Sequence, residues 1–212
     1  VVVMKIVGLT GGIACGKSTL SRLLAADPQI ELIDADVVAH DVLTPGRASY
    51  RSVLKEFGPG VLGEDGLLDR KALGRVVFQD DQARRRLNAI VNGAIARDMA
   101  WALLGHFLRG TPVVVLDVPL LFETGLHRLC YEIIAVTVSP EVQLLRLMDR
   151  DKAGEEDALA RIAAQPMTAA EKAARATYPI VNEGGSEDLA RAAISLLPKV
   201  KRLTLLHRLM SG

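Results

Sequence analysis

A glycine-rich segment near the N-terminus has the residue types and spacing of a loop that binds phosphate. In the segment GLTGGIACGKST, four residues separate Gly11 from Gly16-Lys17-Ser18, and the segment lies between an expected strand and an expected helix. Glycines let backbone N–H groups converge on phosphate oxygens, and a helix N-terminus adds positive potential there. A turn that binds nothing is the alternative. The residues expected to contact the phosphates of ATP are Gly11, Gly12, Ile13, Ala14, Cys15, Gly16, Lys17, Ser18 and Thr19.

Two side chains of this loop have defined chemical roles. Lys17 is expected to reach the β and γ phosphates, and the hydroxyl of Ser18 to bind Mg²⁺. Cys15 has two interpretations: the helix N-terminus lowers its pKa and makes it oxidisable, or it is a small side chain that fills the loop.

Carboxylates follow two other expected strands. Asp34 and Asp36 come just after the second strand, where one of them can orient a hydroxyl group while a phosphoryl group is transferred. Each could instead cap the next helix. Asp117 ends the third strand, as a carboxylate that holds Mg²⁺ would, or it caps the turn at Pro119.

Arginines spaced by one helical turn form a further candidate group. Arg146 and Arg150 lie on one helix face, where they could neutralise charge on the transferred phosphoryl group. The alternative is a solvated face of ion pairs with Asp149 and the acidic residues 155–157.

Short apolar runs alternate with helical patterns, which predicts an α/β fold with a five-stranded parallel sheet flanked by helices. The expected strands are Lys5–Leu9, Ile30–Ile33, Pro112–Val118, Glu132–Val138 and Tyr178–Val181. The expected helices are Lys17–Ala26, Val37–Leu43, Ala48–Phe57, Arg70–Phe78, Asp80–Leu108, Pro140–Arg150, Glu155–Ala164, Ala169–Ala176 and Ser186–Leu209.

We expect three parts. Residues 1–38, 106–148 and 176–212 form the nucleotide-binding core, residues 39–105 a helical substrate subdomain, and residues 149–175 a small helical lid.

Composition limits the possible environment and partners. The 212 residues carry a net charge of +1, so no overall field attracts nucleic acid or an anionic membrane. Two cysteines cannot build a disulfide framework, and no apolar run is long enough to span a bilayer. We expect a cytoplasmic protein, a monomer or weak homo-oligomer, without nucleic-acid or membrane partners. The four histidines lack metal-ligand spacing, and the basic stretch Lys199–Arg208 is expected to pack on the sheet.

Five segments together resemble the dephospho-CoA kinase family, a family of phosphate-loop kinases. They are GLTGGIACGKST, IDADVVAH, FGPGVLGEDGLLDRKALGRVVF, DVPLLFE and RLMDRD, and the likeness continues through EKAARATYPIVNEGGS. The resemblance implies transfer of phosphate from ATP, with Mg²⁺, to the ribose 3′-hydroxyl of dephospho-CoA. This reaction gives coenzyme A and ADP, the last step of coenzyme A synthesis.

The resemblance also implies roles for individual residues. Asp36 would be the base, Lys17 the phosphate clamp, and Arg146 and Arg150 would act from the lid side. Asn182 and Gly184 would lie near the adenine of ATP, and Asp117 would join Ser18 at the metal. The acceptor site would be shaped by Asp34, His40, Asp69, Arg70, Leu120, Leu121 and Glu123.

The chain departs from the family pattern at a few positions, where we expect altered Michaelis constants before lost chemistry. They are Asn92-Gly93 for His-Pro, Gln165-Pro166-Met167 for Gln-Met-Pro, and Thr177 and Val181 for Asp. Two other functions stay open from the residues alone: a kinase for a different small alcohol or nucleoside monophosphate, and a nucleotide-gated binding protein.

Overall fold

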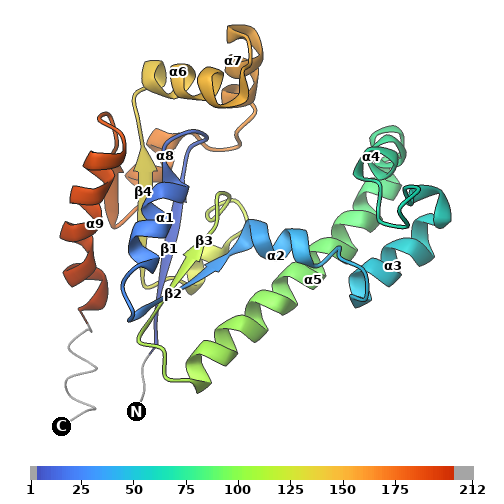
Figure 1. The fold of residues 1–212 in the computed structure, drawn as a ribbon, viewed down its shortest axis with the longest axis horizontal. Helices are drawn as coiled ribbons and strands as arrows, with labels where there is room; N and C mark the ends of the chain where they lie inside the picture. Colours follow the sequence, from blue (N-terminus) through green and yellow to red (C-terminus); the bar gives the residue numbers. More distant parts are fainter. Residues whose placement is uncertain (1–3, 203–212) are drawn as a thin grey trace. The chain divides into compact units, whose positions relative to one another are not determined.

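The computed structural model describes residues 4–202, apart from the side chains of Arg70 and Gln79. The chain divides into two compact units (Figure 1). The sheet unit comprises the described parts of Val1–Ile33 and His106–Gly212, and the helical unit comprises Asp34–Gly105.

A five-stranded sheet forms the centre of the sheet unit, in the order β2-β3-β1-β4-β5. Strand β1 pairs in parallel with β3 and β4, and β4 pairs in parallel with β5. The strands span Lys5–Gly11 (β1), Ile30–Asp34 (β2), Val113–Asp117 (β3), Glu132–Thr137 (β4) and Tyr178–Val181 (β5). The predicted fold class is confirmed.

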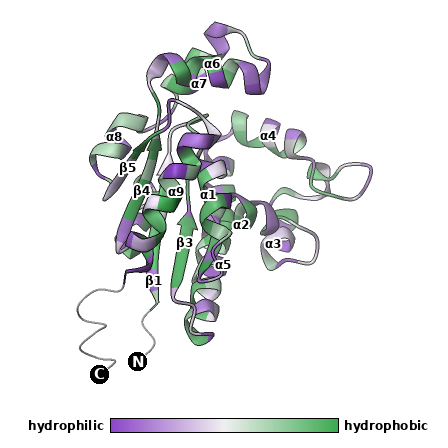
Figure 2. Cartoon of the chain, turned by 60° about the vertical axis from the view of Figure 1, so that its left-hand side comes forward, coloured by the Kyte–Doolittle hydropathy of each residue, from purple (hydrophilic) through white to green (hydrophobic). Residues whose placement is uncertain are grey.

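The central strands are apolar along their whole length because helices cover both faces of the sheet. Every residue of β3 is buried, as are nearly all residues of β1 and β4, and these strands are green in the hydropathy view of Figure 2. Burial on both faces explains why the runs do not alternate with polar residues.

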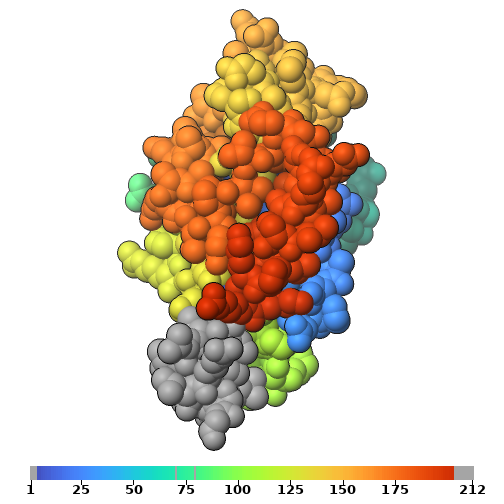
Figure 3. Space-filling model, turned by 90° about the vertical axis from the view of Figure 1, so that its left-hand side faces the viewer, coloured from blue at the N-terminus to red at the C-terminus, as the bar shows by residue number. Residues whose placement is uncertain are grey.

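Helices of the sheet unit pack on this core. α1 packs against α9, α8 packs on β4 and β1, and α6 contacts α7. Figure 3 shows α9, in red, covering one side of the unit, with α6 and α7 at one end. These helices span Lys17–Ala25 (α1), Pro140–Asp151 (α6), Glu155–Ala163 (α7), Ala169–Ala174 (α8) and Ser186–Lys201 (α9), with a 3₁₀ turn at Leu126–Leu129 (η2).

The last helix ends earlier than predicted. We expected it to run to Leu209, but it ends at Lys201, where Arg202 has extended backbone angles. The remaining residues of the expected segment, 203–209, lie outside the described residues. Val200 is buried in the sheet core, so up to Lys201 the stretch packs as predicted.

The helical unit has a small apolar core of its own. Val53, Val61 and Leu73 are buried, with Phe57 and Leu87 among the half-buried side chains packed on them. Its helices span Ala35–Asp41 (α2), Ala48–Phe57 (α3), Arg70–Gln79 (α4) and Asp81–Leu108 (α5), with a 3₁₀ turn at Pro59–Val61 (η1). The last residues of α5 belong to the sheet unit.

Among residues 4–202, no helix combines the length and the apolar character needed to cross a bilayer.

Candidate active site

The predicted phosphate loop connects β1 to α1. Gly16 precedes α1 with φ +95°, in the left-handed region, which glycine adopts without a steric penalty. A Cβ atom on Gly16 would lie 2.5 Å from Nδ2 of Asn182, so both the backbone angle and the close approach require glycine. Ala14 also has a positive φ, +58°, a conformation that costs a residue with a Cβ atom about 1–3 kcal/mol.

Lys17 pairs with Asp117, so the structure brings these two predicted site residues together. Nζ of Lys17 lies 2.5 Å from Oδ1 of Asp117, and the two side chains are 13% and 2% exposed. Asp117 is the last residue of β3, as predicted. The buried carboxylate therefore fixes the lysine beside the loop that it was predicted to serve.

Three side-chain amides hold the backbone of the loop from outside. Gln143 Nε2 donates to the carbonyl of Ile13 at 2.8 Å, and Gln165 Oε1 accepts from the N–H of Ile13 at 2.8 Å. Asn182 Nδ2 donates to the carbonyl of Cys15 at 2.9 Å. Two loop carbonyls are thus directed toward amide donors.

The sequence did not lead us to Gln143, or to the contact of Asn182 with the loop. Gln143 and Leu147 are the buried residues of α6, four positions apart, so a polar residue on the buried helix face was the available signal. Oδ1 of Asn182 also accepts from the N–H of Gly185 at 3.0 Å, and its place near adenine stays a prediction. The N–H of Gly184 donates to Asp188 at 2.7 Å.

Cys15 is fully buried, and burial raises the pKa of its thiol. Of the two interpretations of this cysteine, the geometry favours the small side chain that fills the loop, because a reactive thiol needs access and a low pKa.

Arg146 and Arg150 both lie on α6 but have different partners. Arg146 donates to the carbonyls of Asn182 and Glu183, at 2.8 and 3.0 Å. Arg150 donates to Asp151 through two hydrogen bonds, of 2.7 and 3.0 Å, and Arg161 pairs with the same carboxylate at 2.9 Å. Arg150 is therefore in an ion pair, as the alternative interpretation has it, but with Asp151 and not with Asp149 or the acidic residues 155–157.

The loop that follows β3 is fixed by a buried lysine from α8. Nζ of Lys172 lies 3.0 Å from Oε1 of Glu123 and donates to the carbonyl of Pro119 at 2.6 Å. The predicted acceptor residue Glu123 therefore has a structural partner. Leu121 is fully buried, whereas Leu120 is 43% exposed.

Helix α8 belongs to the part of the chain predicted as a lid, yet it packs on the sheet. Ala169 and Lys172 are buried, and Arg175 stacks over the ring of Phe122 at 4.3 Å. Movement of residues 149–175 as one piece would break all of these contacts.

In the helical unit, Asp34 caps α2. Its Oδ1 accepts from the N–H groups of Asp36 and Val37, at 2.8 and 3.3 Å. The capping interpretation therefore applies to Asp34, and Asp36 is the second residue of a helix that starts two residues earlier than predicted. The side chain of His40 is 67% exposed and lies 3.5 Å from Asp41.

Asp69 caps α4 in the same way. Its Oδ1 accepts from the N–H of Lys71 at 2.8 Å, and hydrogen bonds from the backbone of Ala72 and Lys71 lower the pKa of its carboxyl group. Arg70 is the first residue of α4, and its predicted side-chain role lies outside what the structure describes.

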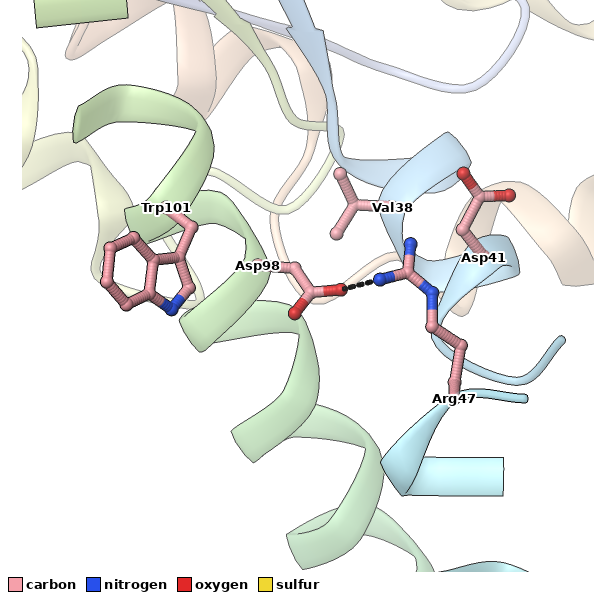
Figure 4. A pocket seen from close by; sticks show the side chains of 5 residues that line it. All are labelled: Val38, Asp41, Arg47, Asp98 and Trp101. Carbon is pink, nitrogen blue, oxygen red and sulfur yellow. Dashed lines mark ion pairs between the residues drawn. The ribbon is translucent and has the colours of Figure 1, made fainter. Parts of the chain in front are cut away.

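A pocket of about 330 Å³ opens between α2 and α5 within the helical unit. Figure 4 shows its polar lining, in which Arg47 and Asp98 form an ion pair of 3.3 Å. Trp101, 65% exposed, supplies an aromatic side chain. The pocket is lined by Val38, Asp41, Arg47, Asp98 and Trp101.

The departures from the family pattern fit into the fold. The hydroxyl of Thr177 accepts the N–H of Ile133 at 3.1 Å, and α5 continues through Asn92-Gly93 without a break. Val181 ends β5, one of the two edge strands of the sheet, and is 64% exposed. Gln165 is the residue that binds Ile13.

Within the part of the chain that the structure describes, no group of three or more His, Cys, Asp or Glu side chains could hold a metal ion. The oxygens of Ser18 and Asp117 are nevertheless hard ligands of the kind that Mg²⁺ binds together with nucleotide phosphates. This donor set fits an ion that is shared with a nucleotide.

Three features together define a phosphate-loop kinase fold. They are a phosphate loop between β1 and α1, a lysine paired with the carboxylate that ends β3, and a five-stranded parallel sheet. Comparison with known proteins narrows this class. The family model described as dephospho-CoA kinase matches residues 5–188. The chain belongs to the dephospho-CoA kinase family.

Individual relatives are similar to this protein in sequence or structure along most of the chain. It is 47% identical over 192 residues to a dephospho-CoA kinase of Symbiobacterium thermophilum, covering 90% of this chain and 79% of the relative. It is 42% identical to one of Arabidopsis thaliana, covering 94% and 85%. The solved dephospho-CoA kinase of Campylobacter jejuni superimposes with a TM-score of 0.62 at 26% identity, covering 93% and 97%.

Proposed function

We propose that this chain transfers the γ-phosphoryl group of ATP to the 3′-hydroxyl of dephospho-CoA, giving coenzyme A and ADP, the final step of coenzyme A synthesis. Family membership supports the acceptor. The observation that carries the donor side is the pair of Lys17 and Asp117 beside the phosphate loop.

The phosphate loop binds the donor. Its inward N–H groups and the start of α1 bind the phosphate oxygens, while Lys17 exchanges Asp117 for the β and γ phosphates. Ser18 and Asp117 would hold Mg²⁺, which neutralises charge on the phosphates when bound. A bond forms between the 3′-oxygen of the acceptor and the γ phosphorus. The bond between the γ phosphorus and the bridging oxygen breaks, and that oxygen leaves with ADP.

Asp36 orients the acceptor hydroxyl and takes its proton. It follows the last residue of β2 by two positions and lies in the first turn of α2. Asp34 supports it by capping that helix, since the hydrogen bond from the N–H of Asp36 to Asp34 fixes the start of α2. Asp34 is therefore a positioning residue.

Of the two predicted arginines, Arg150 is the one that neutralises the transferred group. Its side chain is 54% exposed and its partner is a carboxylate, which an incoming phosphate can replace because both are oxyanions. Arg146 keeps its contacts with the backbone of 182–183. The mobile part of the proposed lid is α7, because α8 packs on the sheet and the turn after α7 contains Gln165, which binds the N–H of Ile13.

The pocket on α2 and α5 receives part of the acceptor. Val38 lies two residues after Asp36 on the same helix, Trp101 offers a face on which adenine can stack, and Arg47 offers a cation for the diphosphate. His40, Asp69, Arg70, Leu120 and Glu123 remain the other residues proposed to shape the acceptor side.

Two substitutions test these roles. Lys17→Ala should lower kcat by about 10²–10³-fold or more, because it removes a charge directed at the transition state. Asp36→Asn should bind both substrates with near-normal affinity and lose most turnover. An Asp36→Asn enzyme with near-normal kcat would remove Asp36 from the reaction. Nucleotide hydrolysis without any dependence on dephospho-CoA would instead favour a nucleotide-gated binding protein.

A further inference from the structure

The backbone of Ile13 is held by two glutamine side chains from separate helical segments. Gln165 Oε1 accepts its N–H, and Gln143 Nε2 donates to its carbonyl. Gln143 comes from α6, and Gln165 from the turn between α7 and α8. The N–H and the carbonyl of Ile13, which belong to the peptide units before and after this residue, are therefore both hydrogen-bonded from outside the loop.

This arrangement sets the direction of the loop dipoles. A phosphate-binding loop needs its carbonyl oxygens turned away from the ligand and its free N–H groups turned toward it. Gln143 fixes the carbonyl of Ile13, and Asn182 fixes that of Cys15. Gln143 and Asn182 are 5% and 2% exposed, so water competes little for these bonds.

The residue after Ile13 shows why such anchoring is needed. Ala14 has a left-handed φ of +58°, a conformation that persists only where the surroundings enforce it. The hydrogen bond from Gln143 fixes the peptide unit between Ile13 and Ala14, and the hydrogen bond to Gln165 fixes the peptide unit before it. Loss of either bond lets one of these peptide units rotate toward a relaxed conformation and misdirects the N–H groups that follow.

Gln165 also connects the loop to α7. Its Nε2 donates to the carbonyl of Ile162 at 3.2 Å, in the last turn of α7, while its Oε1 binds Ile13. A single side-chain amide thus joins the proposed mobile helix to the phosphate loop.

We infer that Gln165 and Gln143 are positioning residues that set the affinity of the phosphate loop for ATP, Gln165 by accepting the N–H of Ile13 and Gln143 by donating to its carbonyl. The inference rests on the proposed binding of ATP to this loop. It does not depend on the identity of the phosphoryl acceptor.

The test measures binding of Mg²⁺-ATP by calorimetry in the absence of dephospho-CoA, so that failure of the proposed reaction cannot affect it. Gln165→Met and Gln143→Met keep the volume of the side chain and remove the hydrogen bond. Each should raise the dissociation constant about tenfold, the effect of leaving one buried polar group without a partner. The exposed Gln29 provides the control, Gln29→Met, which should bind like the wild type.

Glutamate substitutions separate positioning from general damage. A carboxylate can accept the N–H of Ile13 but cannot donate to its carbonyl. Gln165→Glu and Gln143→Glu each add one negative charge beside Ile13. Gln165→Glu keeps the acceptor for the N–H of Ile13 and loses only the donor to the carbonyl of Ile162, outside the loop. Gln143→Glu loses the donor to the loop carbonyl itself. We expect Gln165→Glu to bind ATP about tenfold more tightly than Gln143→Glu, with similar melting temperatures.

Steady-state kinetics add a second readout. The KM for ATP should rise in both methionine variants, while the KM for dephospho-CoA stays within about twofold, because Ile13 belongs to the loop that binds the donor. Two results would overturn the inference: an equal loss of ATP affinity in the two glutamate variants, or wild-type ATP affinity in both methionine variants.

Discussion

The buried pair of Lys172 and Glu123 allows a quantitative prediction for the substitution Lys172→Met. Their side chains are 2% and 13% exposed, with 3.0 Å between Nζ and Oε1. Methionine fills most of the space but leaves the carboxylate of Glu123 without its cation. Removing one partner of a buried ion pair costs about 3–5 kcal/mol.

In this variant the carbonyl of Pro119 loses one of its two hydrogen bonds, which costs less than the isolated charge on Glu123. It keeps the hydrogen bond from Thr10 Oγ1, of 2.9 Å, when the one from Lys172 is removed. The main cost is therefore the isolated charge. For a chain of this size, 1 kcal/mol shifts the melting temperature by about 2–4 °C, so we expect a decrease of about 6–20 °C.

Urea and thermal unfolding of a matched set check this prediction. Lys152→Met breaks a pair with Asp149 in which both side chains are more than 80% exposed, and should leave the melting temperature almost unchanged because solvent screens such a pair. The double variant Lys172→Met/Glu123→Leu should recover most of the loss, because no buried charge remains. Equal effects of Lys172→Met and Lys152→Met, or a double variant less stable than Lys172→Met, would refute the reasoning.

Three further predictions concern a helix cap, a thiol and a carboxyl group. Asp34→Ala should lower the free energy of unfolding by about 1 kcal/mol by removing the cap of α2, whereas Asp34→Ser should restore most of it; equal urea midpoints for the two variants would contradict the cap. Burial raises the pKa of Cys130 to about 11, so iodoacetamide at pH 8 should modify it far more slowly in native than in urea-unfolded protein, and equal rates would show that the thiol is open. The hydrogen bond from Arg150 lowers the pKa of Asp151 below its ordinary 3.8. The stabilisation that this ion pair gives the folded protein is therefore complete above pH 3.8 and is lost as the pH falls through the lower pKa of the folded state. Amide exchange in α7, measured relative to that in α1, should therefore accelerate in acid in the wild type and be less sensitive to acid in Asp151→Asn; an unchanged profile would speak against the ion pair.

The fold and the donor site were predictable where one local pattern determined the outcome. The strands are uninterrupted apolar runs, because their residues are buried on both faces. The loop spacing from Gly11 to Lys17 specifies a turn and a helix start, and Asp117 marks the end of an apolar run. In these cases the residues that form the sequence pattern are also the residues whose burial or backbone conformation produces the structure.

The remaining interactions depend on residues far apart in the chain. Gln143, Gln165 and Asn182 reach the loop only after the sheet has formed, and nothing in their local sequence names Ile13 or Cys15 as the partner. Asp34 shows a different limit, since a carboxylate after a strand suits both capping and catalysis until the hydrogen bonds are known. The packing of α8 likewise depended on one lysine that is charged in the sequence and buried in the fold.

The most direct test of the proposed function is ADP production by the wild-type chain with ATP and Mg²⁺, with and without dephospho-CoA, followed by mass spectrometry of the product. The account predicts a rate that depends on dephospho-CoA and a product with the mass of coenzyme A. ATP binding with no increase in rate on adding dephospho-CoA would contradict it.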